Sequence, residues 1–400
     1  MHSTLAAIVK NNIEYKILPF QFFLLTFLGI WCPSNWSLKS KTAHNVYFTF
    51  IFFLDFLICI EMFIHFVSSF GTDNFKLINF FLVSANITAV YKSIRLMQNR
   101  EVLRYFIISY FDYEWTKSHD SVEHAINSKI DLRIRRVTVI YSASMIGIVL
   151  LKAMSPIAES NGIPLPVDAW YPYSIEKSKW FWITYLHQVI LGSSAVGAHI
   201  GIDTLFVGLL LKSSGQIHLL NYRLRNLMLL KKCNFGKLKE YSEKNVVLRC
   251  IYHHKRIYRF GGDLNDKFQE ILFILVVSSI PNICINVYSL SSYKGNINVQ
   301  YIATIFSTTS ALLQFFIACW YGNETTLDVN KSLQVINAVY EMDWTNFHVS
   351  TKRLLIFIML RASKPLKFSV AYIIPMNLDS FIKTIKASYT AFNLLQQTTN

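Results

Sequence analysis

Apolar runs of membrane-spanning length recur along the 400-residue chain, separated by polar segments rich in lysine and arginine. The hydrocarbon core of a bilayer is about 30 Å thick, and a helix needs about 20 mostly apolar residues to cross it. The run at 180–211 is long for one span, which indicates tilt or extension beyond the membrane. The pattern predicts six spanning helices, at residues 46–70, 75–97, 137–157, 180–211, 268–290 and 299–321.

Two shorter apolar segments fit helices outside the bilayer core. Residues 17–31 end next to Pro33 and suit a helix that lies at the membrane interface. Residues 354–360 lie between the basic pair Lys352 and Arg353 and the basic residue Arg361, which indicates a cytoplasmic helix near the membrane. Neither segment is expected to cross the bilayer.

The last stretch, 369–397, is polar for an ordinary span, but its polar residues are ordered rather than scattered. A spanning helix with a polar face must turn that face toward protein or water. We therefore expect a seventh spanning helix that lines an aqueous pore. Its small or polar residues recur at helical spacing beside an apolar stripe, along Asn377, Ser380, Thr384, Ala387, Ala391 and Leu394.

The basic residues orient these helices, because short loops rich in lysine and arginine stay in the cytoplasm. With the N-terminus inside, 30 of the 39 Lys and Arg residues fall in cytoplasmic segments and 5 fall outside. The prediction is an all-α membrane protein with seven transmembrane helices, a cytoplasmic N-terminus and an extracellular C-terminus. That orientation is the reverse of a G-protein-coupled receptor and opposes a metabotropic seven-helix receptor.

Composition and charge agree with a protein embedded in the membrane. The chain is 52% hydrophobic and 16% charged, whereas soluble domains average about 45–50% and about 25%. The net charge of +15 lies mainly in the cytoplasmic segments, so we assign it to membrane lipid and expect no nucleic-acid partner. No catalytic, nucleotide-binding or metal-binding motif occurs, so we expect no enzymatic activity, no cofactor and no metal.

Segment 212–267 has too regular a pattern for a simple linker. Apolar residues recur at helical spacing along 217–230 and again along 252–260, with basic residues between them. We expect the fourth and fifth helices to extend into the cytoplasm and to pack together there. A solvated basic loop that binds lipid headgroups is the alternative that remains open.

Charged residues inside the predicted spans are candidates for function or for buried pairing. Asp55, Glu61 and Asp203 are acidic examples, and Lys92 and Arg95 are basic ones. Pairing with a neighbouring charge, or hydration in a crevice, is the favoured interpretation.

Aromatic residues mix with small hydroxyl residues in the outer halves of four predicted spans. A mostly apolar cavity with a few hydroxyl groups suits a small volatile ligand. Core packing is the open alternative for each of these residues taken singly. The candidate ligand-binding residues are Phe80, Ser84, Ile87, Tyr91, Tyr141, Ser144, Met145, Ile148, Trp182, Tyr185, Val189, Tyr301, Ile305 and Thr308.

The C-terminal quarter carries an ordered series of motifs. They are CWYGNE at 319–324, AVY at 338–340, Trp344, KRLL at 352–355, RASKP at 361–365, PMNLDSF at 375–381 and KASYTAFNLL at 386–395. In sequence and spacing this series resembles the insect odorant receptor family. Outside residues 319–395 the resemblance extends only to topology and loop lengths. The chain departs from the family at 370–371, where Ala-Gly is common, and at Ala391, where a tyrosine is common.

The resemblance implies an organisation for the whole chain. It implies a cytoplasmic N-terminal segment at 1–42, a six-helix bundle at 43–322, a cytoplasmic anchor at 323–368, and a pore helix with the extracellular C-terminus at 369–400. The last helix would be split into a cytoplasmic part, 346–364, and a pore-lining part, 375–397. Matching the final motif places Leu394 at the hydrophobic gate and Gln397 at a polar ring one turn along. The other residues expected along the pore are Ala387, Thr390 and Ala391.

The resemblance also implies a function. The chain is expected to be the odour-tuning subunit of a non-selective cation channel that is opened by small volatile molecules. It would act in the plasma membrane of olfactory sensory neurons, as a hetero-tetramer with an obligate co-receptor. The alternatives are a gustatory-receptor-like channel, a metabotropic receptor and a secondary transporter, for which no internal repeat is present.

Overall fold

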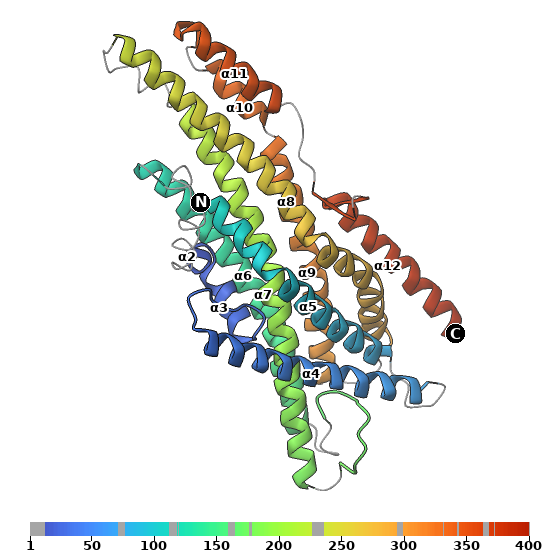
Figure 1. Cartoon of the computed structure of the whole chain (residues 1–400). Helices are drawn as coiled ribbons and strands as arrows, with labels where there is room; N and C mark the ends of the chain where they lie inside the picture. The colour runs from blue at the N-terminus through green and yellow to red at the C-terminus, as the bar shows by residue number, and fades with distance from the viewer. Residues whose placement is uncertain are drawn as a thin grey trace.

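The computed structural model describes most of the chain as long helices. The seven longest elements follow the seven predicted spans in order (Figure 1). They are α4 (Leu38–Ser68), α5 (Leu77–Phe111), α6 (Ser121–Ala158), α7 (Ser178–Arg225), α8 (Gly236–Ser291), α9 (Val299–Asn330) and α12 (Leu378–Thr399). The described residues are 13–70, 77–111, 118, 120–158, 165–175, 178–225, 236–293, 299–330, 332–341, 344–362, 368–371 and 373–399.

Shorter elements precede the bundle and connect its last two long helices. Residues 1–12 of the predicted N-terminal segment, and residues 363–367 of the predicted anchor, lie outside the described ranges. The short elements are α2 (Ile13–Ile17), α3 (Pro19–Phe27), α10 (Ser332–Glu341), the 3-10 helix η3 (Trp344–Asn346), α11 (Val349–Ala362), β1 (Ser369–Val370) and β2 (Ile374–Pro375).

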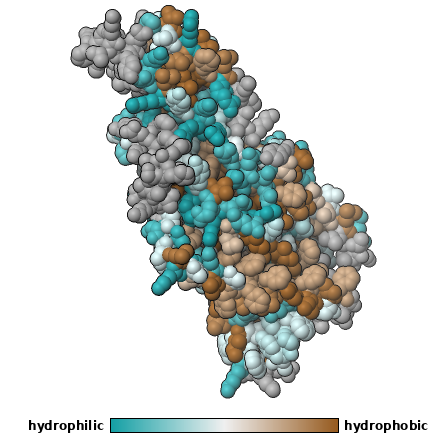
Figure 2. All heavy atoms as spheres, in the orientation of Figure 1, coloured by the Kyte–Doolittle hydropathy of each residue, from teal (hydrophilic) through white to brown (hydrophobic). Residues whose placement is uncertain are grey.

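Within the described ranges, α4, α6, α7, α8 and α9 are long and apolar enough to cross a membrane. Figure 2 shows hydrophobic residues gathered in a broad band over α4 and its neighbours, with mostly hydrophilic residues directly above the band and mostly near-neutral residues below it. In α5 and α12 polar residues interrupt the apolar stretches. A helix with a polar face spans a membrane when that face meets protein or water.

Helix α7 forms the centre of the bundle and packs against α3, α4, α5, α6, α8 and α9. The leucines of α3 lie directly on glycines of α7, because a Cβ atom built at Gly201 would stand 2.8 Å from Leu25. On the opposite side of α3, Phe23 and Phe27 are exposed. The predicted interfacial segment is therefore amphipathic, with one face in the core and one face outward.

Helices α7 and α8 extend together toward the end of the molecule where α10 and α11 lie (Figure 1). Helix α11 packs against α8, and α10 packs against α7 and α11. We call this end the basic end of the bundle, defined by residues 212–225 of α7 and 236–267 of α8. The two predicted apolar stripes pack together here, since Leu220, Leu224, Ile257 and Phe260 are all buried. Residues 226–235, between the two helices, lie outside the described ranges.

A two-stranded hairpin leads into α12. Strands β1 and β2 pair antiparallel, with Val370 opposite Ile374. The side chain of Asn377 accepts a hydrogen bond from the Ser380 amide at 2.9 Å and so caps the first turn of α12. Ala371, at the hairpin turn, has a φ of 49°, in the left-handed region that favours glycine.

Replacing Ala371 by glycine is therefore expected to stabilise the receptor. A non-glycine residue pays about 1–2 kcal/mol for the left-handed conformation, and removal of the Cβ relieves that cost. The greater freedom of glycine in the unfolded chain offsets part of the gain. The thermal midpoint of the purified protein should rise in Ala371→Gly. An unchanged or lower midpoint would mean that the turn carries no strain.

Candidate functional site

A cavity lies inside the bundle, between helices α5, α6, α7, α8 and α9, and its volume is about 140 Å³. We call it the inner cavity. Its wall is mainly aliphatic, with several amides and hydroxyls that face the same space. The lining residues are Phe81, Leu82, Ala85, Asn86, Thr88, Met145, Ile148, Val149, Lys152, Ala153, Pro166, Val167, Gln188, Val189, Gly192, Ala195, Val196, His199, Ser278, Asn282, Ser307, Ser310, Ala311 and Gln314.

The segment between α6 and α7 covers the inner cavity at the end away from the basic end. Pro166 and Val167 of this segment line the cavity. The side chain of Gln188, on α7, accepts from the Val167 amide at 3.0 Å and donates to the Val167 carbonyl at 2.9 Å. The same amide nitrogen reaches the hydroxyl of Tyr171 at 3.0 Å. One buried glutamine therefore holds the covering segment on the bundle.

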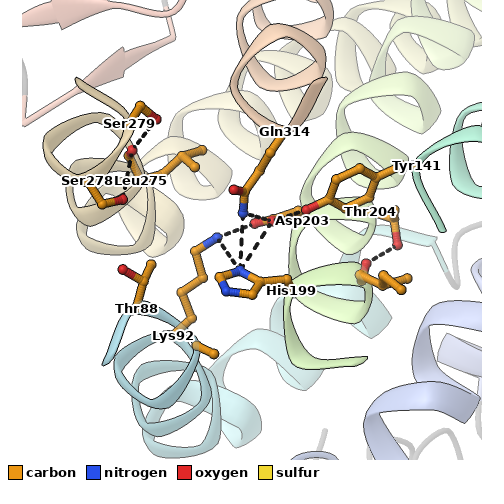
Figure 3. Close-up of polar contacts among 12 residues, drawn as sticks. Thr88, Lys92, Tyr141, His199, Asp203, Thr204, Leu275, Ser278, Ser279 and Gln314 are labelled. Atoms are coloured by element: carbon orange, nitrogen blue, oxygen red, sulfur yellow. Dashed lines mark hydrogen bonds and ion pairs between the residues drawn. The ribbon is translucent and has the colours of Figure 1, made fainter. Parts of the chain in front are cut away.

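A polar cluster, Lys92, Tyr141, His199, Asp203 and Gln314, borders the inner cavity through His199 and Gln314 (Figure 3). Its centre is the carboxylate of Asp203, whose Oδ1 accepts from the Lys92 ammonium at 2.7 Å. The other oxygen, Oδ2, accepts from the Tyr141 hydroxyl at 3.0 Å and from the Gln314 amide nitrogen at 2.6 Å. The cluster thus joins α5, α6, α7 and α9 at one carboxylate.

The hydrogen bonds of His199 assign its tautomer. Its Nε2 lies 3.1 Å from the carbonyl oxygen of Ala85, which can only accept, so Nε2 carries the proton. The unprotonated Nδ1 then accepts from the amide nitrogen of Gln314 at 3.1 Å. A neutral His199 in this tautomer satisfies both neighbours.

Because the polar cluster is buried, its contribution to stability depends on how completely its two charges are paired. Lys92 is 0% exposed and Asp203 is 8% exposed, so water does not screen the two charges. A buried ion pair compensates the loss of hydration only when further hydrogen bonds satisfy both partners. Tyr141 and Gln314 supply those bonds to the carboxylate. The pairing that was favoured for Asp203 is present, and its partner is Lys92.

Three of the predicted ligand residues, Met145, Ile148 and Val189, line the inner cavity. Tyr141 belongs to the polar cluster instead, and the hydroxyl of Tyr185 donates to the carbonyl of Ala153 at 2.8 Å. Four others, Phe80, Ile87, Trp182 and Ile305, are exposed on the outside of the bundle. The predicted residues that do not line this cavity are Phe80, Ser84, Ile87, Tyr91, Tyr141, Ser144, Trp182, Tyr185, Tyr301, Ile305 and Thr308.

Several polar lining residues were not predicted, among them Asn86, Gln188, Asn282, Ser310 and Gln314. Each is a neutral polar residue inside an apolar helix. Such a residue needs a buried partner or a cavity, because an unpaired polar group in an apolar medium is costly. Neutral amides inside apolar spans indicate the lining of this cavity more directly than aromatic residues do.

The predicted pore residues lie mainly on the exposed face of α12. Ala387, Thr390, Leu394 and Gln397 are exposed, and Ala391 is half-buried. The predicted small and polar stripe runs from buried to exposed surroundings along the helix, because its earlier members Ser380 and Thr384 are buried and its later members are more exposed. Helix α12 packs against α8 and α9, with the Ser388 hydroxyl donating to the Ile280 carbonyl at 3.2 Å.

Over the described residues, no three His, Cys, Asp or Glu side chains come together in a way that could hold a metal ion.

Comparison with known proteins identifies relatives along nearly the whole chain. The family model described as 7tm Odorant receptor matches residues 74–389. Odorant receptor 10 of Aedes albopictus is 25% identical over 344 residues, which cover 85% of this chain and 88% of that protein. Odorant receptor 46a, isoform B, of Drosophila melanogaster is 23% identical, with 98% of this chain and 99% of that protein covered.

Solved structures show the same fold. The insect olfactory receptor OR5 from Machilis hrabei matches with a TM-score of 0.81 and 16% identity, covering 96% of this chain and 98% of its own. The same receptor in complex with eugenol matches with a TM-score of 0.80, covering 97% and 99%. The seven-helix prediction is thereby confirmed, with α5 and α12 as spanning helices.

Proposed function

Because this chain belongs to the seven-transmembrane odorant receptor family, and is a multi-pass membrane receptor rather than an enzyme, we propose that its inner cavity is the odorant site. The observation that carries the proposal is a mainly aliphatic cavity between the spanning helices. An apolar cavity of about 150 Å³ binds benzene. The inner cavity, at about 140 Å³, therefore suits a molecule built on a single small ring.

We propose that odorant binding is transmitted to α12 through α8 and α9. Both helices contribute lining residues to the inner cavity, and both pack against α12. A ligand shifts an equilibrium only if it binds one conformation better than the other. An odorant that favours a changed spacing of α8 and α9 would move α12 as well.

We further propose that α12 lines a cation pore in an assembly of four subunits that includes a co-receptor. Its exposed face combines the aliphatic Leu394 with polar and charged side chains, including Lys383, Lys386 and Gln397. Such a face is costly in lipid and is satisfied beside water. A ring of leucines closes a pore by excluding water, and a slight widening admits hydrated ions.

In this proposal the receptor lies in the plasma membrane of olfactory sensory neurons. Its basic end faces the cytoplasm. The charge distribution supports it, because lysine and arginine concentrate in the segments at that end. An epitope at the C-terminus should be stained on intact cells, and one at the N-terminus only after permeabilisation. The reverse staining pattern would refute the orientation.

Filling the inner cavity tests the odorant site. Gly192 lines the cavity, and a Cβ atom built there meets no heavy atom within 4 Å. Gly192→Leu should therefore occupy ligand space without displacing a neighbour. We expect odour-evoked currents to require at least about fivefold more odorant, since overpacking costs at least about 1 kcal/mol.

Gly262→Leu is the matched control. Gly262 lies on α8 outside the cavity lining, and a Cβ atom built there also meets nothing within 4 Å. Its concentration dependence should resemble that of the wild type. Equal responses in both variants would remove the inner cavity as the odorant site.

A further inference from the structure

Among the described residues, two polar atoms of side chains that line the inner cavity are buried and have no hydrogen-bond partner. They are Oδ1 of Asn282, on α8, and Oγ of Ser310, on α9. Both side chains are more than nine-tenths buried, with exposed fractions of 9% for Asn282 and 2% for Ser310. Two helices that pack against each other thus each contribute to the wall of the same cavity one residue with an unpaired polar atom.

Several other polar side chains of the lining are paired within the protein. The amide nitrogen of Asn86 donates to the Leu82 carbonyl at 2.9 Å, and Ser278 donates to the Leu275 carbonyl at 3.2 Å. Gln188 and Gln314 are held as described above. Local backbone bonding is therefore the usual solution on these helices, and Asn282 Oδ1 and Ser310 Oγ depart from it.

An unpaired polar atom in an apolar wall is destabilising until something bonds to it. A ligand that fills the cavity excludes water from these atoms, so it must pair with them itself or leave them unpaired. The amide oxygen of Asn282 only accepts, so its partner must be a donor. The hydroxyl of Ser310 can donate or accept, so it tolerates either kind of partner.

We propose that the inner cavity selects a monocyclic odorant that carries a hydroxyl group. The hydroxyl donates to Asn282 Oδ1, and its oxygen is an acceptor for Ser310 Oγ, while the ring occupies the aliphatic remainder of the cavity. The proposal rests on the inner cavity being the odorant site. An aldehyde of the same size can pair only with Ser310, and a hydrocarbon pairs with neither.

Three compounds with equal numbers of non-hydrogen atoms test this ranking: benzyl alcohol, benzaldehyde and ethylbenzene. Each is titrated against the purified full-length receptor, and binding is measured as an increase in thermal stability. The wild type should bind benzyl alcohol about tenfold more tightly than ethylbenzene, with benzaldehyde between them. Equal affinities for the three compounds would overturn the proposal and leave the odorant site in place.

Two variants place the recognition at the named atoms. In Asn282→Leu the preference for benzyl alcohol over ethylbenzene should disappear, and ethylbenzene should bind at least as tightly as to the wild type. Ser310→Ala, a smaller change, should reduce the preference and abolish the advantage of benzaldehyde over ethylbenzene. A preference that survives unaltered in Ser310→Ala and in any folded Asn282→Leu protein would overturn the assignment.

Ser279→Ala is the control, because Ser279 lies outside the lining and its hydroxyl already donates to the Leu275 carbonyl at 2.6 Å. It should keep the wild-type ranking of the three compounds. A wild-type receptor that none of the three stabilises would contradict the odorant site itself, and this inference with it.

Discussion

Replacing Lys92 by methionine is expected to destabilise the receptor by about 3–5 kcal/mol, the usual cost of leaving one member of a buried ion pair alone. The ammonium of Lys92 lies 2.7 Å from Asp203 Oδ1 and is fully buried. Without it, the carboxylate keeps only the neutral donors Tyr141 and Gln314. Methionine has nearly the same length and no charge, so the change is mainly electrostatic.

The double variant Lys92→Met/Asp203→Asn removes both charges and should recover most of the lost stability. Lys212→Met is the control, because Lys212 pairs with Asp131 at 2.6 Å and the aspartate is 56% exposed. An exposed pair contributes about 0–1 kcal/mol. The stability of each of the three variants is measured as the thermal midpoint of the purified protein. A loss in Lys92→Met no larger than in Lys212→Met would show that the polar cluster does not stabilise the fold.

Replacing Leu394 by alanine should raise the resting current of cells that also express the co-receptor. The Leu394 side chain is 59% exposed on the face of α12 that we assign to the pore. Each apolar carbon removed from a pore constriction weakens its exclusion of water. Because burying one methylene is worth about 0.8 kcal/mol, the loss of three carbons should raise the leak on the order of 50-fold.

Ile382→Ala tests whether the effect belongs to the position. Ile382 is also exposed on α12, at 49%, but lies on a different side of the helix from Leu394. It should leave the resting current unchanged. Patch-clamp recording before and during odour application separates leak from evoked current. Identical resting currents in the wild type and Leu394→Ala would contradict the pore assignment.

The spanning helices were predictable because the bilayer imposes a length of apolar sequence that few other structures require. The predicted spans are shorter than the helices that contain them. Helix α6 begins at Ser121 and α8 at Gly236, well before the apolar runs that begin at 137 and 268. Hydropathy reports only the part of a helix that lies in lipid. The buried stripes of segment 212–267 were the sequence signal for the rest.

The site was less predictable, because a cavity depends on how each helix is rotated about its axis. Phe80 and Phe81 are neighbours in sequence, yet only Phe81 lines the inner cavity. Periodicity assigns residues to a face but does not say which helix that face meets. The partner of Asp203 was likewise hidden, because Lys92 lies 111 residues away in the chain.

Chemical modification at one position tests most directly whether an odorant occupies the inner cavity. In Gly192→Cys the new thiol lines the cavity, and its modification by a small neutral thiol reagent can be timed with and without an activating odorant. We predict protection on the order of 100-fold at an odorant concentration of 100 Kd, with no protection of Gly262→Cys. An unchanged modification rate of Gly192→Cys under saturating odorant would place the odorant elsewhere.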